Sequence, residues 1–465
     1  MVSFSRFSGI LFKNKACRIP HLCAFYMAQV MGEFRSQISL PENEFPRRWY
    51  NVLPDLSPPL PPPKEPEAGP SRMEFLAKTM IHECLRQESS SERWVSIPYE
   101  VRELYLQAGR PRPLYRARRL EKRLGLKLVR LYYKREDLSP TGSHKVNTAL
   151  AQAYYAQKEG KTTLSTETGA GQWGTALSYA AKLAGLDCVV FWVRSVYDWK
   201  TDRRTLMKLY GAKVFPSPST ETRTGRDTLA KDPHHQGSLG LAVSEGLEYA
   251  EAHEGAVYCL GSVLNHVLMH QSVIGLEAIK QFEMVGDSPD LIVGCLGGGS
   301  NFGGLALPFV GEVLQKKREC DFLAVQTAAS PTLVSGQYRY DFGDVAEHTP
   351  LMMMYTIGHQ SEMTPIKADG LRYHAASPII SALRHGGIVR ATACPTDERA
   401  VFEAAKLFLE SEGWLIAPES SYAVKGSIDE ALKAERAGKE KAICMNISGH
   451  GFLDIEAYRE RLSIN

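Results

Sequence analysis

From about residue 127 to its end, the chain alternates short apolar runs with longer stretches in which apolar residues recur at helical spacing. The runs are hydrophobic on both faces, which is typical of strands buried between layers of helices. Two of the helical stretches run from Trp173 to Ala184 and from Val401 to Leu409. This alternation predicts βαβ units, mostly parallel sheets, and ligands bound at the carboxyl ends of the strands. We expect buried strands at 188–193, 291–296, 322–326 and 442–447, and irregular excursions at 332–348 and 375–387.

The composition is that of an ordinary globular protein, with 44% apolar and 23% charged residues and a net charge of +3 over 465 residues. This charge gives no basic excess that would favour nucleic acid, and there is no run of 18 apolar residues that would favour a membrane span. Nine cysteines are scattered without a CxxC spacing. That pattern favours a reducing compartment over a disulfide framework or a zinc site.

The first 70 residues differ from the rest. No Asp or Glu precedes Glu33, whereas four Lys and Arg residues do, which is typical of an organellar transit peptide. An over-extended start explains the same pattern slightly better, since Met27 and Met31 are later candidate starts. We therefore expect a cytoplasmic protein, or an organellar one if the segment is a transit peptide. The Pro-rich stretch 54–70 is expected to be an extended surface connector.

A glycine-rich turn follows the strand expected at 291–296. Bare glycines let backbone N–H groups close on an anion, and the N-terminus of the following helix adds positive potential. The turn is neither a dinucleotide fingerprint, because Phe302 replaces the last glycine, nor a Walker loop, because no Lys-Ser/Thr follows. A simple tight turn would explain two glycines but not three followed by Ser-Asn, so we predict a phosphate site. Its residues are Gly297, Gly298, Gly299, Ser300 and Asn301.

Lys145 opens another helical pattern, directly after His144. A helix N-terminus disfavours a cation and lowers its pKa, which suits a nucleophilic amine. Taken alone, Lys145 is better explained as a solvated lysine. Together with a phosphate loop, it predicts a Schiff base to a phosphorylated aldehyde, and pyridoxal phosphate fits that description.

The stretch STETGAGQWG combines the acid Glu167 with a glycine-rich turn before a helix. GAGQ, at 169–172, offers backbone N–H donors for a carboxylate such as that of an amino-acid substrate, and Glu167 would move protons beside it. A lone Glu before a turn is more often a helix cap, so this role depends on the other motifs. His266 and His270 have metal-ligand spacing, but no Glu follows His266 and no third ligand is apparent. We therefore predict no metal site there.

Several motifs in order resemble those of tryptophan synthase beta chains. The resemblance runs from about residue 109 to the C-terminus. The segments FPRRWYNVLPDLSPPLPPP and DPHHQGSLGLAVSE are similar to the second type of beta chain, which is not the usual partner of the alpha subunit. The motifs are GRPRPLYRA, YYKREDLSPTGSHKVNTALAQ, ETGAGQWG, CLGGGSN, the PES of APESSYAV, and NISGHG.

The resemblance implies a fold-type II pyridoxal-phosphate enzyme with two three-layer α/β domains, mostly parallel sheets and the cofactor between them. We expect an N-terminal extension over 1–70, a domain carrying the cofactor lysine over 71–260, and a domain carrying the phosphate loop over 261–465, with the N-terminal segment free to cross over. Lys145 and Glu167 are the implied catalytic residues. Cofactor contacts are implied for Lys145, His144, Asn147, Gly297, Gly298, Gly299, Ser300, Asn301, Glu419 and Ser448, and substrate contacts for Thr168, Gly169, Ala170, Gly171 and Gln172.

The implied reaction replaces the β-hydroxyl of L-serine with indole to give L-tryptophan. Ser448 would face the pyridine nitrogen of the cofactor, and a neutral Ser there favours β-elimination over reactions that need a long-lived carbanion. Two rivals remain open. One is a serine or threonine dehydratase, or another β-replacement enzyme, on the same fold. The other is a non-catalytic ligand-binding homologue.

Two departures from the family pattern alter the expected pocket. Trp173 stands where the family usually has a His after GAGQ. GGIVRATA, with Arg390, stands where a GRADY-like stretch usually supplies an acid that helps to close the domain over serine. An Arg there would suit a phosphate, so O-phospho-L-serine is an alternative donor, with Arg390 as a substrate-binding residue. A surface ion pair explains Arg390 equally well. The family also implies a homodimer without a stable alpha-subunit complex, and a monovalent cation site.

Overall fold

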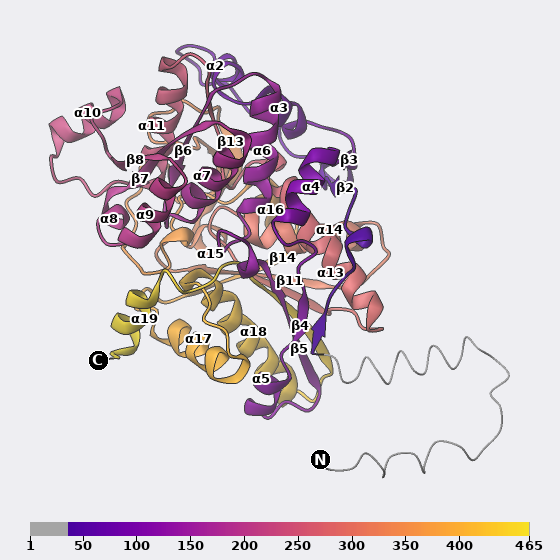
Figure 1. Cartoon of the computed structure of the whole chain (residues 1–465). Helices are drawn as coiled ribbons and strands as arrows, with labels where there is room; N and C mark the ends of the chain where they lie inside the picture. Colours follow the sequence, from indigo (N-terminus) through magenta and orange to yellow (C-terminus); the bar gives the residue numbers. More distant parts are fainter. Residues whose placement is uncertain (1–35, 465) are drawn as a thin grey trace, which may run out of the picture.

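The larger of the two main sheets has seven strands, in a computed structural model that describes residues 36–464. From β5 to β14 neighbouring strands run parallel, whereas β1 and β4 join at one edge in antiparallel pairs. In Figure 1, β5 and β4 reach into the lower half of the molecule. The strands in order are β1 (Gln37–Ile38), β4 (Leu114–Arg116), β5 (Val129–Arg135), β15 (Lys441–Ile447), β10 (Leu291–Cys295), β11 (Asp321–Thr327) and β14 (Val389–Cys394).

Helices cover both faces of this sheet. Successive residues of a strand point to opposite faces, so each strand packs against helices on both sides. On β10, Val293 packs into one buried cluster with residues of α17 and α18, whereas Ile292 packs into another with residues of α13 and α14. This explains why the strands are apolar on both faces. The four helices are α13 (Val273–Met284), α14 (Ser300–Leu314), α17 (Arg399–Glu412) and α18 (Pro418–Arg436).

The smaller sheet has four parallel strands and lies in the upper half of Figure 1. Val190 of β7 lies next to α7, whereas Phe191 packs with Ala242 of α11, so these two helices cover opposite faces. Helix α6 packs alongside α7. The strands in order are β8 (Lys213–Ser217), β7 (Asp187–Val193), β6 (Thr163–Thr168) and β9 (Ala256–Tyr258), and the helices are α6 (Val146–Lys158), α7 (Gln172–Ala184) and α11 (Leu239–Ala252).

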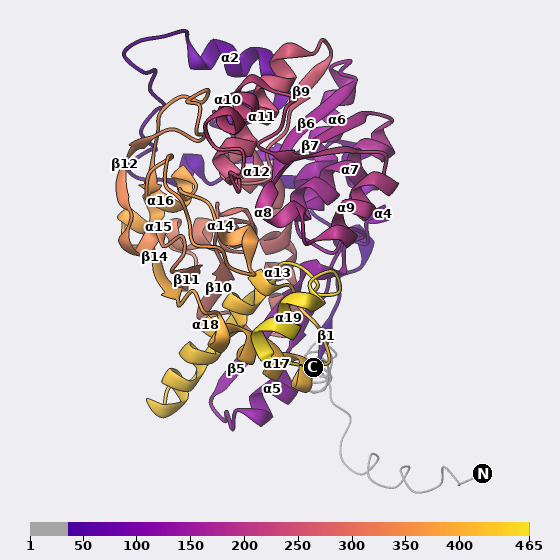
Figure 2. The same cartoon turned by 90° about the vertical axis from the view of Figure 1, so that its left-hand side faces the viewer.

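Each of these two sheets forms an α/β unit with the helices that cover it, here called the larger and the smaller unit. Shorter elements complete the two units (Figure 2). Strands β2 (Arg48–Tyr50) and β3 (Trp94–Ser96) form one antiparallel pair, and β12 (Gln337–Asp341) and β13 (Met352–Thr356) form another. No helix of residues 36–464 is both long and apolar enough to cross a membrane. The remaining helices are α2 (Arg72–Thr79), α3 (His82–Glu88), α4 (Tyr99–Gln107), α5 (Arg118–Arg123), α8 (Arg194–Tyr197), α9 (Thr201–Leu209), α10 (Arg223–Lys231), α12 (Asn265–Gln271), α15 (Thr332–Ser335), α16 (Pro378–His385) and α19 (Ile455–Leu462).

The four strands expected from apolar runs are confirmed as β7, β10, β11 and β15. The expectation of irregular structure at 332–348 and 375–387 is wrong, because these segments contain β12 and α16. Both are short, so their periodicity is weak in the sequence. The expected division at residues 260 and 261 allowed the N-terminal segment to cross over between the two sheets. Strands β1, β4 and β5 precede Lys145 in the chain yet pair within the larger sheet, next to β15.

The Pro-rich stretch 54–70 lies along the β12–β13 pair. Lys64 exchanges two backbone hydrogen bonds of 2.9 Å with Leu351, and the Tyr340 hydroxyl donates to the Pro62 carbonyl at 3.0 Å. Most residues of the stretch are exposed, as expected for an extended surface connector. The acid-free segment before Glu33, and with it the transit-peptide hypothesis, lies outside the described residues.

Candidate active site

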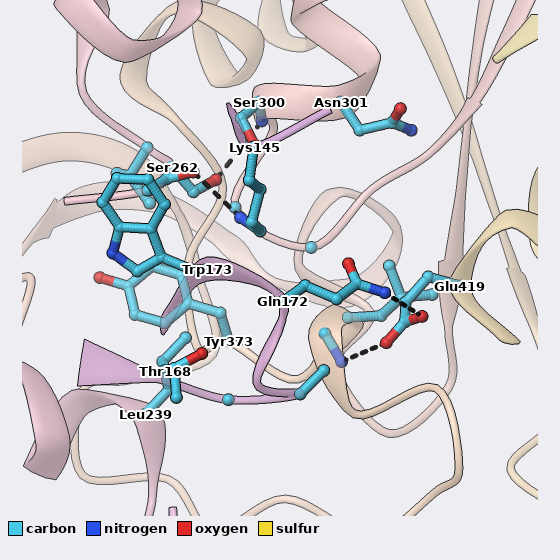
Figure 3. Close-up of a pocket in the computed structure, with 18 of the residues that line it drawn as sticks. Lys145, Thr168, Gln172, Trp173, Leu239, Ser262, Ser300, Asn301, Tyr373 and Glu419 are labelled. Atoms are coloured by element: carbon cyan, nitrogen blue, oxygen red, sulfur yellow. Dashed lines mark hydrogen bonds between the residues drawn. The ribbon is translucent and has the colours of Figure 1, made fainter. Parts of the chain in front are cut away.

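One cavity between the two units gathers most of the residues that the sequence singles out (Figure 3). It lies where β6 and β10 end, as expected for the carboxyl ends of parallel strands. Of the predicted site residues, His144, Lys145, Glu167, Thr168, Gly169, Ala170, Gln172, Gly297, Gly298, Gly299, Ser300, Asn301, Glu419 and Ser448 line it.

Lys145 is the N-cap residue of α6, and its side chain points into the cavity (Figure 3). The ammonium group donates a 3.0 Å hydrogen bond to the Gly261 carbonyl. Burial lowers the pKa of Lys145 to about 8, although Glu167 and Glu419 oppose this shift. A fraction of the amine is therefore unprotonated near neutral pH and able to act as a nucleophile.

Glu167 lies near the carboxyl end of β6 and is buried. Burial raises the pKa of its carboxyl to about 7, and a hydrogen bond from the Tyr258 hydroxyl is the largest opposing influence. The Tyr258 oxygen lies 2.5 Å from Glu167 Oε2. A carboxyl with this pKa can both give and accept a proton near neutral pH.

The turn 297–299 joins β10 to α14, so its N–H groups lie at a helix N-terminus. Side chains have no room there. A Cβ on Gly297 would lie 2.7 Å from the Gly370 carbonyl oxygen, and one on Gly298 would lie 2.5 Å from Ser262 Oγ. Gly299 has a φ of +121°, which disfavours any side chain. The glycines therefore leave bare backbone facing the cavity, as an anion site requires.

His144 and Ser300 extend this turn. The His144 Nε2 atom lies 3.1 Å from Ser300 Oγ. Burial, assisted by the neighbouring Lys145 cation, lowers the pKa of His144 to about 3, so the ring is neutral at physiological pH. Asn301 lines the cavity, but its side chain is engaged behind it, donating to the Cys295 carbonyl at 3.1 Å and accepting from Asn446 at 2.6 Å.

The GAGQ turn follows β6 and leads into α7. Its Gly171 has a φ of +88° and lies against Trp192, where a Cβ would come within 2.5 Å of the indole ring. Trp192 Nε1 also donates to the Gly169 carbonyl at 2.7 Å. Gly171 therefore packs against Trp192 on the side of the turn away from the cavity, whereas Gly169, Ala170 and Gln172 line the cavity.

The larger unit supplies the opposite wall through Glu419 and Ser448. Glu419, in the first turn of α18, accepts hydrogen bonds from the Gln172 amide at 3.1 Å and from the Gly370 N–H at 2.9 Å (Figure 3). Burial raises its pKa. The Ser448 hydroxyl lies 2.9 Å from Ser420 Oγ.

Comparisons with known proteins agree with this geometry. Residues 105–449 match a protein family described as pyridoxal-phosphate dependent enzyme. The chain is 51% identical over 427 residues to tryptophan synthase beta chain 2 of Methanothermobacter thermautotrophicus, covering 92% of this chain and 99% of that one. It is 54% identical to tryptophan synthase beta chain 2 of Pyrococcus abyssi, covering 92% and 96%. The chain belongs to the tryptophan synthase beta chain family.

Solved structures with the same fold are more distant. The L-serine ammonia-lyase of Rhizomucor miehei is 17% identical with a TM-score of 0.56, and covers 76% of this chain and 98% of its own. Isoform 2 of threonine deaminase from Solanum lycopersicum is 16% identical with a TM-score of 0.56, and covers 87% and 98%. These likenesses show the fold alone. Together with the family match over residues 105–449, they confirm the prediction of a fold-type II pyridoxal-phosphate enzyme with mostly parallel sheets.

The cavity fits the cofactor of the tryptophan synthase beta chain family. Three groups face it: the amine of Lys145, the glycine turn 297–299 and the N-terminus of α14. At Gly297 and Gly298 a side chain would overlap neighbouring atoms, so the turn must stay bare. These are the groups that hold the aldehyde and the phosphate of pyridoxal phosphate.

Three residues expected at the site do not line the cavity: Gly171, which lies behind the GAGQ turn, Arg390 and Asn147. Arg390 lies on the edge strand β14 with 44% of its side chain exposed, and donates to Glu430 at 3.1 Å. It does not line the cavity, so the expectation that it meets a donor phosphate is wrong, and the surface ion pair is correct. Asn147 is directed away, because its side chain bonds to Arg110 and Glu136 below α6.

Other residues of the wall were missed by sequence reasoning. Gly261 and Ser262 follow β9, and Leu239 and Tyr373 come from α11 and from the loop before α16. No sequence motif gave them a role at the site, because they reach the cavity through tertiary packing. Trp173, the departure from the family pattern, also lines the cavity, and its Nε1 donates to Thr166 Oγ1 at 2.6 Å.

His266 and His270 are structural in this arrangement. His266 Nδ1 lies 2.9 Å from Glu88, and His270 lies between Thr148 and Gln87 at 3.0 and 2.8 Å. In the part of the chain that the structure describes, no group of three or more His, Cys, Asp or Glu side chains is arranged to hold a metal ion.

Proposed function

We propose that this chain joins L-serine to indole, forming L-tryptophan and water, with pyridoxal phosphate as its cofactor. The observation that carries the proposal is the convergence of Lys145, Glu167 and the 297–301 turn on one cavity. The family supplies the substrates, since the relatives at about half identity are named tryptophan synthase beta chains.

Pyridoxal phosphate, when bound, supplies an electron sink for the bonds that break at the substrate's α-carbon. The N–H groups of the 297–299 turn would hold its phosphate, with the hydroxyl of Ser300 beside them. Ser448 would face its pyridine nitrogen. Its hydroxyl already has a partner in Ser420 at 2.9 Å, and it carries no charge that would protonate the nitrogen.

Lys145 and Glu167 would carry out the proton transfers. Lys145 Nζ, with a pKa of about 8, would attach the cofactor and, once displaced by serine, remove the α-proton. Glu167, with a pKa of about 7, would protonate the departing hydroxyl, which leaves as water, and later accept the proton released from C3 of indole. The N–H groups of 168–172 would hold the substrate carboxylate.

L-Serine is the donor that we propose. The case for O-phospho-L-serine depended on Arg390, which pairs with Glu430 outside the cavity. Initial rates of tryptophan formation from the two donors at equal concentration test this choice. We expect the L-serine rate to be the higher, and a faster phosphoserine rate would contradict the proposed donor.

The rival functions predict other products. A dehydratase-like enzyme would release pyruvate from serine and form no tryptophan. A non-catalytic homologue would bind without turnover, although both Lys145 and Glu167 face the cavity. Mass spectrometry of the products formed from serine and ring-deuterated indole distinguishes these functions. Deuterated tryptophan supports the proposal, and pyruvate alone would replace it with β-elimination.

For the oligomeric state and the cellular location, the proposal uses what the resemblance to the family implies. We propose a homodimer in the cytoplasm, without a stable alpha-subunit complex and with a monovalent cation near the cofactor. Light scattering of the purified chain, alone and mixed with an alpha subunit, tests the assembly. Rates in potassium, sodium and tetramethylammonium buffers test the cation.

A further inference from the structure

The carboxyl group of Glu167 is held through one of its two oxygens. The Tyr258 hydroxyl donates to Oε2 at 2.5 Å, and Thr166 Oγ1 lies 3.3 Å from the same atom. Thr166 has one hydroxyl proton, and its nearest acceptor is the Cys259 carbonyl at 2.6 Å. Tyr258 is therefore the strong side-chain donor to Glu167, and Oε1 takes part in neither contact.

Backbone pairing places the two side chains on one face of the small sheet. Tyr258 of β9 is the partner of Ser165 in β6, and Glu167 follows Ser165 by two residues. Residues two apart on a strand face the same side, so the tyrosine reaches the carboxyl diagonally. The side chain of Tyr258 is buried, with 3% exposure.

A glycine makes room for this tyrosine. Gly246 lies within α11, where a Cβ would come 2.9 Å from Tyr258 Cε2. Glycine inside a helix costs about 1 kcal/mol relative to alanine, so space for the ring is the physical reason for it. The Ser165 hydroxyl also donates to the Gly246 carbonyl at 2.8 Å, which fixes the helix against β6.

We propose that Tyr258 is a positioning residue that fixes the Glu167 carboxyl by its Oε2 atom, so that Oε1 carries the transferable proton toward the cavity. The inference rests on the proposed function for its catalytic meaning. The proton balance is simple: Oε1 gives its proton to the departing hydroxyl, which leaves as water, and takes one back from indole.

Other groups surround this carboxyl from neighbouring elements. Lys145 approaches from α6, and its positive charge favours the ionised form of Glu167. Tyr373 and Cys259 also lie within electrostatic reach, but burial raises the pKa of each, so both remain neutral. The charge of Asp344 helps to raise the pKa of Tyr258. Burial raises the pKa of Asp344, but contacts led by its hydrogen bond with His348 outweigh burial and keep Asp344 ionised. Burial raises the pKa of Glu167 most, and the influences that lower it are, in order, the Tyr258 hydroxyl, the backbone N–H of Glu167 itself, the Lys145 charge and the Thr166 hydroxyl.

Infrared titration of the holoenzyme tests the proposal without relying on turnover. The protonated-carboxyl band of Glu167 is assigned by its loss in Glu167→Gln, and its midpoint is compared with that in Tyr258→Phe. A hydrogen bond to a charged group contributes about 1.5–3 kcal/mol, so losing it moves the midpoint upward by about one pH unit or more. An unchanged midpoint would overturn the proposal.

The pH profile of tryptophan formation gives a second readout. In Tyr258→Phe the limb assigned to Glu167 moves to higher pH by the same amount, while the KM of serine stays within about twofold. The matched control is Tyr132→Phe, which also removes a hydroxyl bonded to a carboxylate, Asp287 at 2.7 Å, but outside the cavity. Its profile stays that of the wild type. Equal profiles in all three proteins would contradict the proposal.

A second variant covers the case in which Tyr258→Phe does not fold. Replacing Tyr258 by 3-fluorotyrosine keeps the ring and makes the hydroxyl a stronger donor, so the infrared midpoint of Glu167 moves to lower pH. A shift to higher pH, or none, overturns the proposal. If the infrared midpoints shift as expected but wild-type enzyme makes no tryptophan, the proposed function fails while the Tyr258–Glu167 link stands.

Discussion

Gln172 and Glu419 join the two α/β units across the cavity, through a 3.1 Å hydrogen bond from the Gln172 amide to Glu419 Oε2. Gln172 begins α7 at the end of the turn that would hold the substrate carboxylate, and Glu419 belongs to the first turn of α18. The other oxygen of Glu419 is bound to the Gly370 N–H. The position of the carboxylate turn relative to the larger unit therefore depends on this bond.

Removing the amide in Gln172→Ala should weaken serine binding more than it slows chemistry. Losing a buried hydrogen bond costs about 1–3 kcal/mol, which predicts an increase of about tenfold in the KM of serine. Steady-state kinetics with indole saturating measure it. Gln157→Ala removes an amide bonded to Ala184 on an exposed surface and should leave KM unchanged. Equal KM values in both variants would show that the bond does not position the turn.

Gly298→Ala should weaken cofactor binding, because the added Cβ would lie 2.5 Å from Ser262 Oγ at the mouth of the phosphate turn. We expect the dissociation constant of pyridoxal phosphate to rise about tenfold or more, which corresponds to about 1.4 kcal/mol. Absorbance titration of the apoenzyme measures it. Gly386→Ala, where the Cβ has ordinary contacts of 3.4 Å or more, is the control and should bind normally.

The stability of the protein should depend on pH through Glu167. Burial raises its pKa from 4.5 to about 7, so the folded state holds this proton more tightly than the unfolded state. The associated stability is present below pH 4.5 and is lost as the pH rises through 7, by about 3 kcal/mol in total.

Glu167→Gln cannot ionise, so its unfolding free energy relative to wild type should increase between pH 5 and pH 8. Urea unfolding of the holoenzyme at several pH values measures this difference. The exposed Glu254→Gln should show no such trend. A constant difference for Glu167→Gln would mean that this carboxyl is ionised throughout.

Five charged side chains form a fully buried network beneath α6, and Asn147 belongs to it. Glu277 accepts from Arg110 at 2.7 Å and from Lys134 at 2.7 Å, and all three side chains have no exposure. Glu136 pairs with Arg110 and with Arg112 in the same network.

Glu277→Ala would leave buried cations without their partner, so we expect a loss of about 3–5 kcal/mol in the free energy of unfolding. Urea denaturation measures it. Glu312→Ala, which breaks the more exposed pair with Arg318, should cost about 1 kcal/mol or less. Similar losses in the two variants would contradict this account of the network.

Local patterns in the sequence carried most of the successful predictions. Buried strands and the 297–301 turn are visible because apolar runs and consecutive glycines act within a few residues. The Gln172–Glu419 and Tyr258–Glu167 bonds span 247 and 91 residues, so no local pattern marks them. Strands β1 and β4, of two and three residues, are too short to show a period, so the sequence left open which strands carry the expected crossing of the N-terminal segment.

Asn147 and Arg390 lie away from the cavity for a related reason. Asn147 lies two positions after Lys145, and on a helix that spacing turns its side chain away from the lysine toward the buried ions. Arg390 occupies an edge strand, where it forms an ion pair with Glu430 of α18. In both cases the residue type suited the predicted role, but the direction of the side chain did not.

We propose that Lys145, Glu167 and the phosphate turn form a tryptophan-forming site. The initial rate of tryptophan formation from L-serine and indole with pyridoxal phosphate, for the wild type, Lys145→Ala and Arg390→Ala, tests this proposal. We expect tryptophan from the wild type, a loss of about a thousandfold or more in Lys145→Ala, and an unchanged rate in Arg390→Ala. No tryptophan from the wild type, or full activity without Lys145, would contradict it.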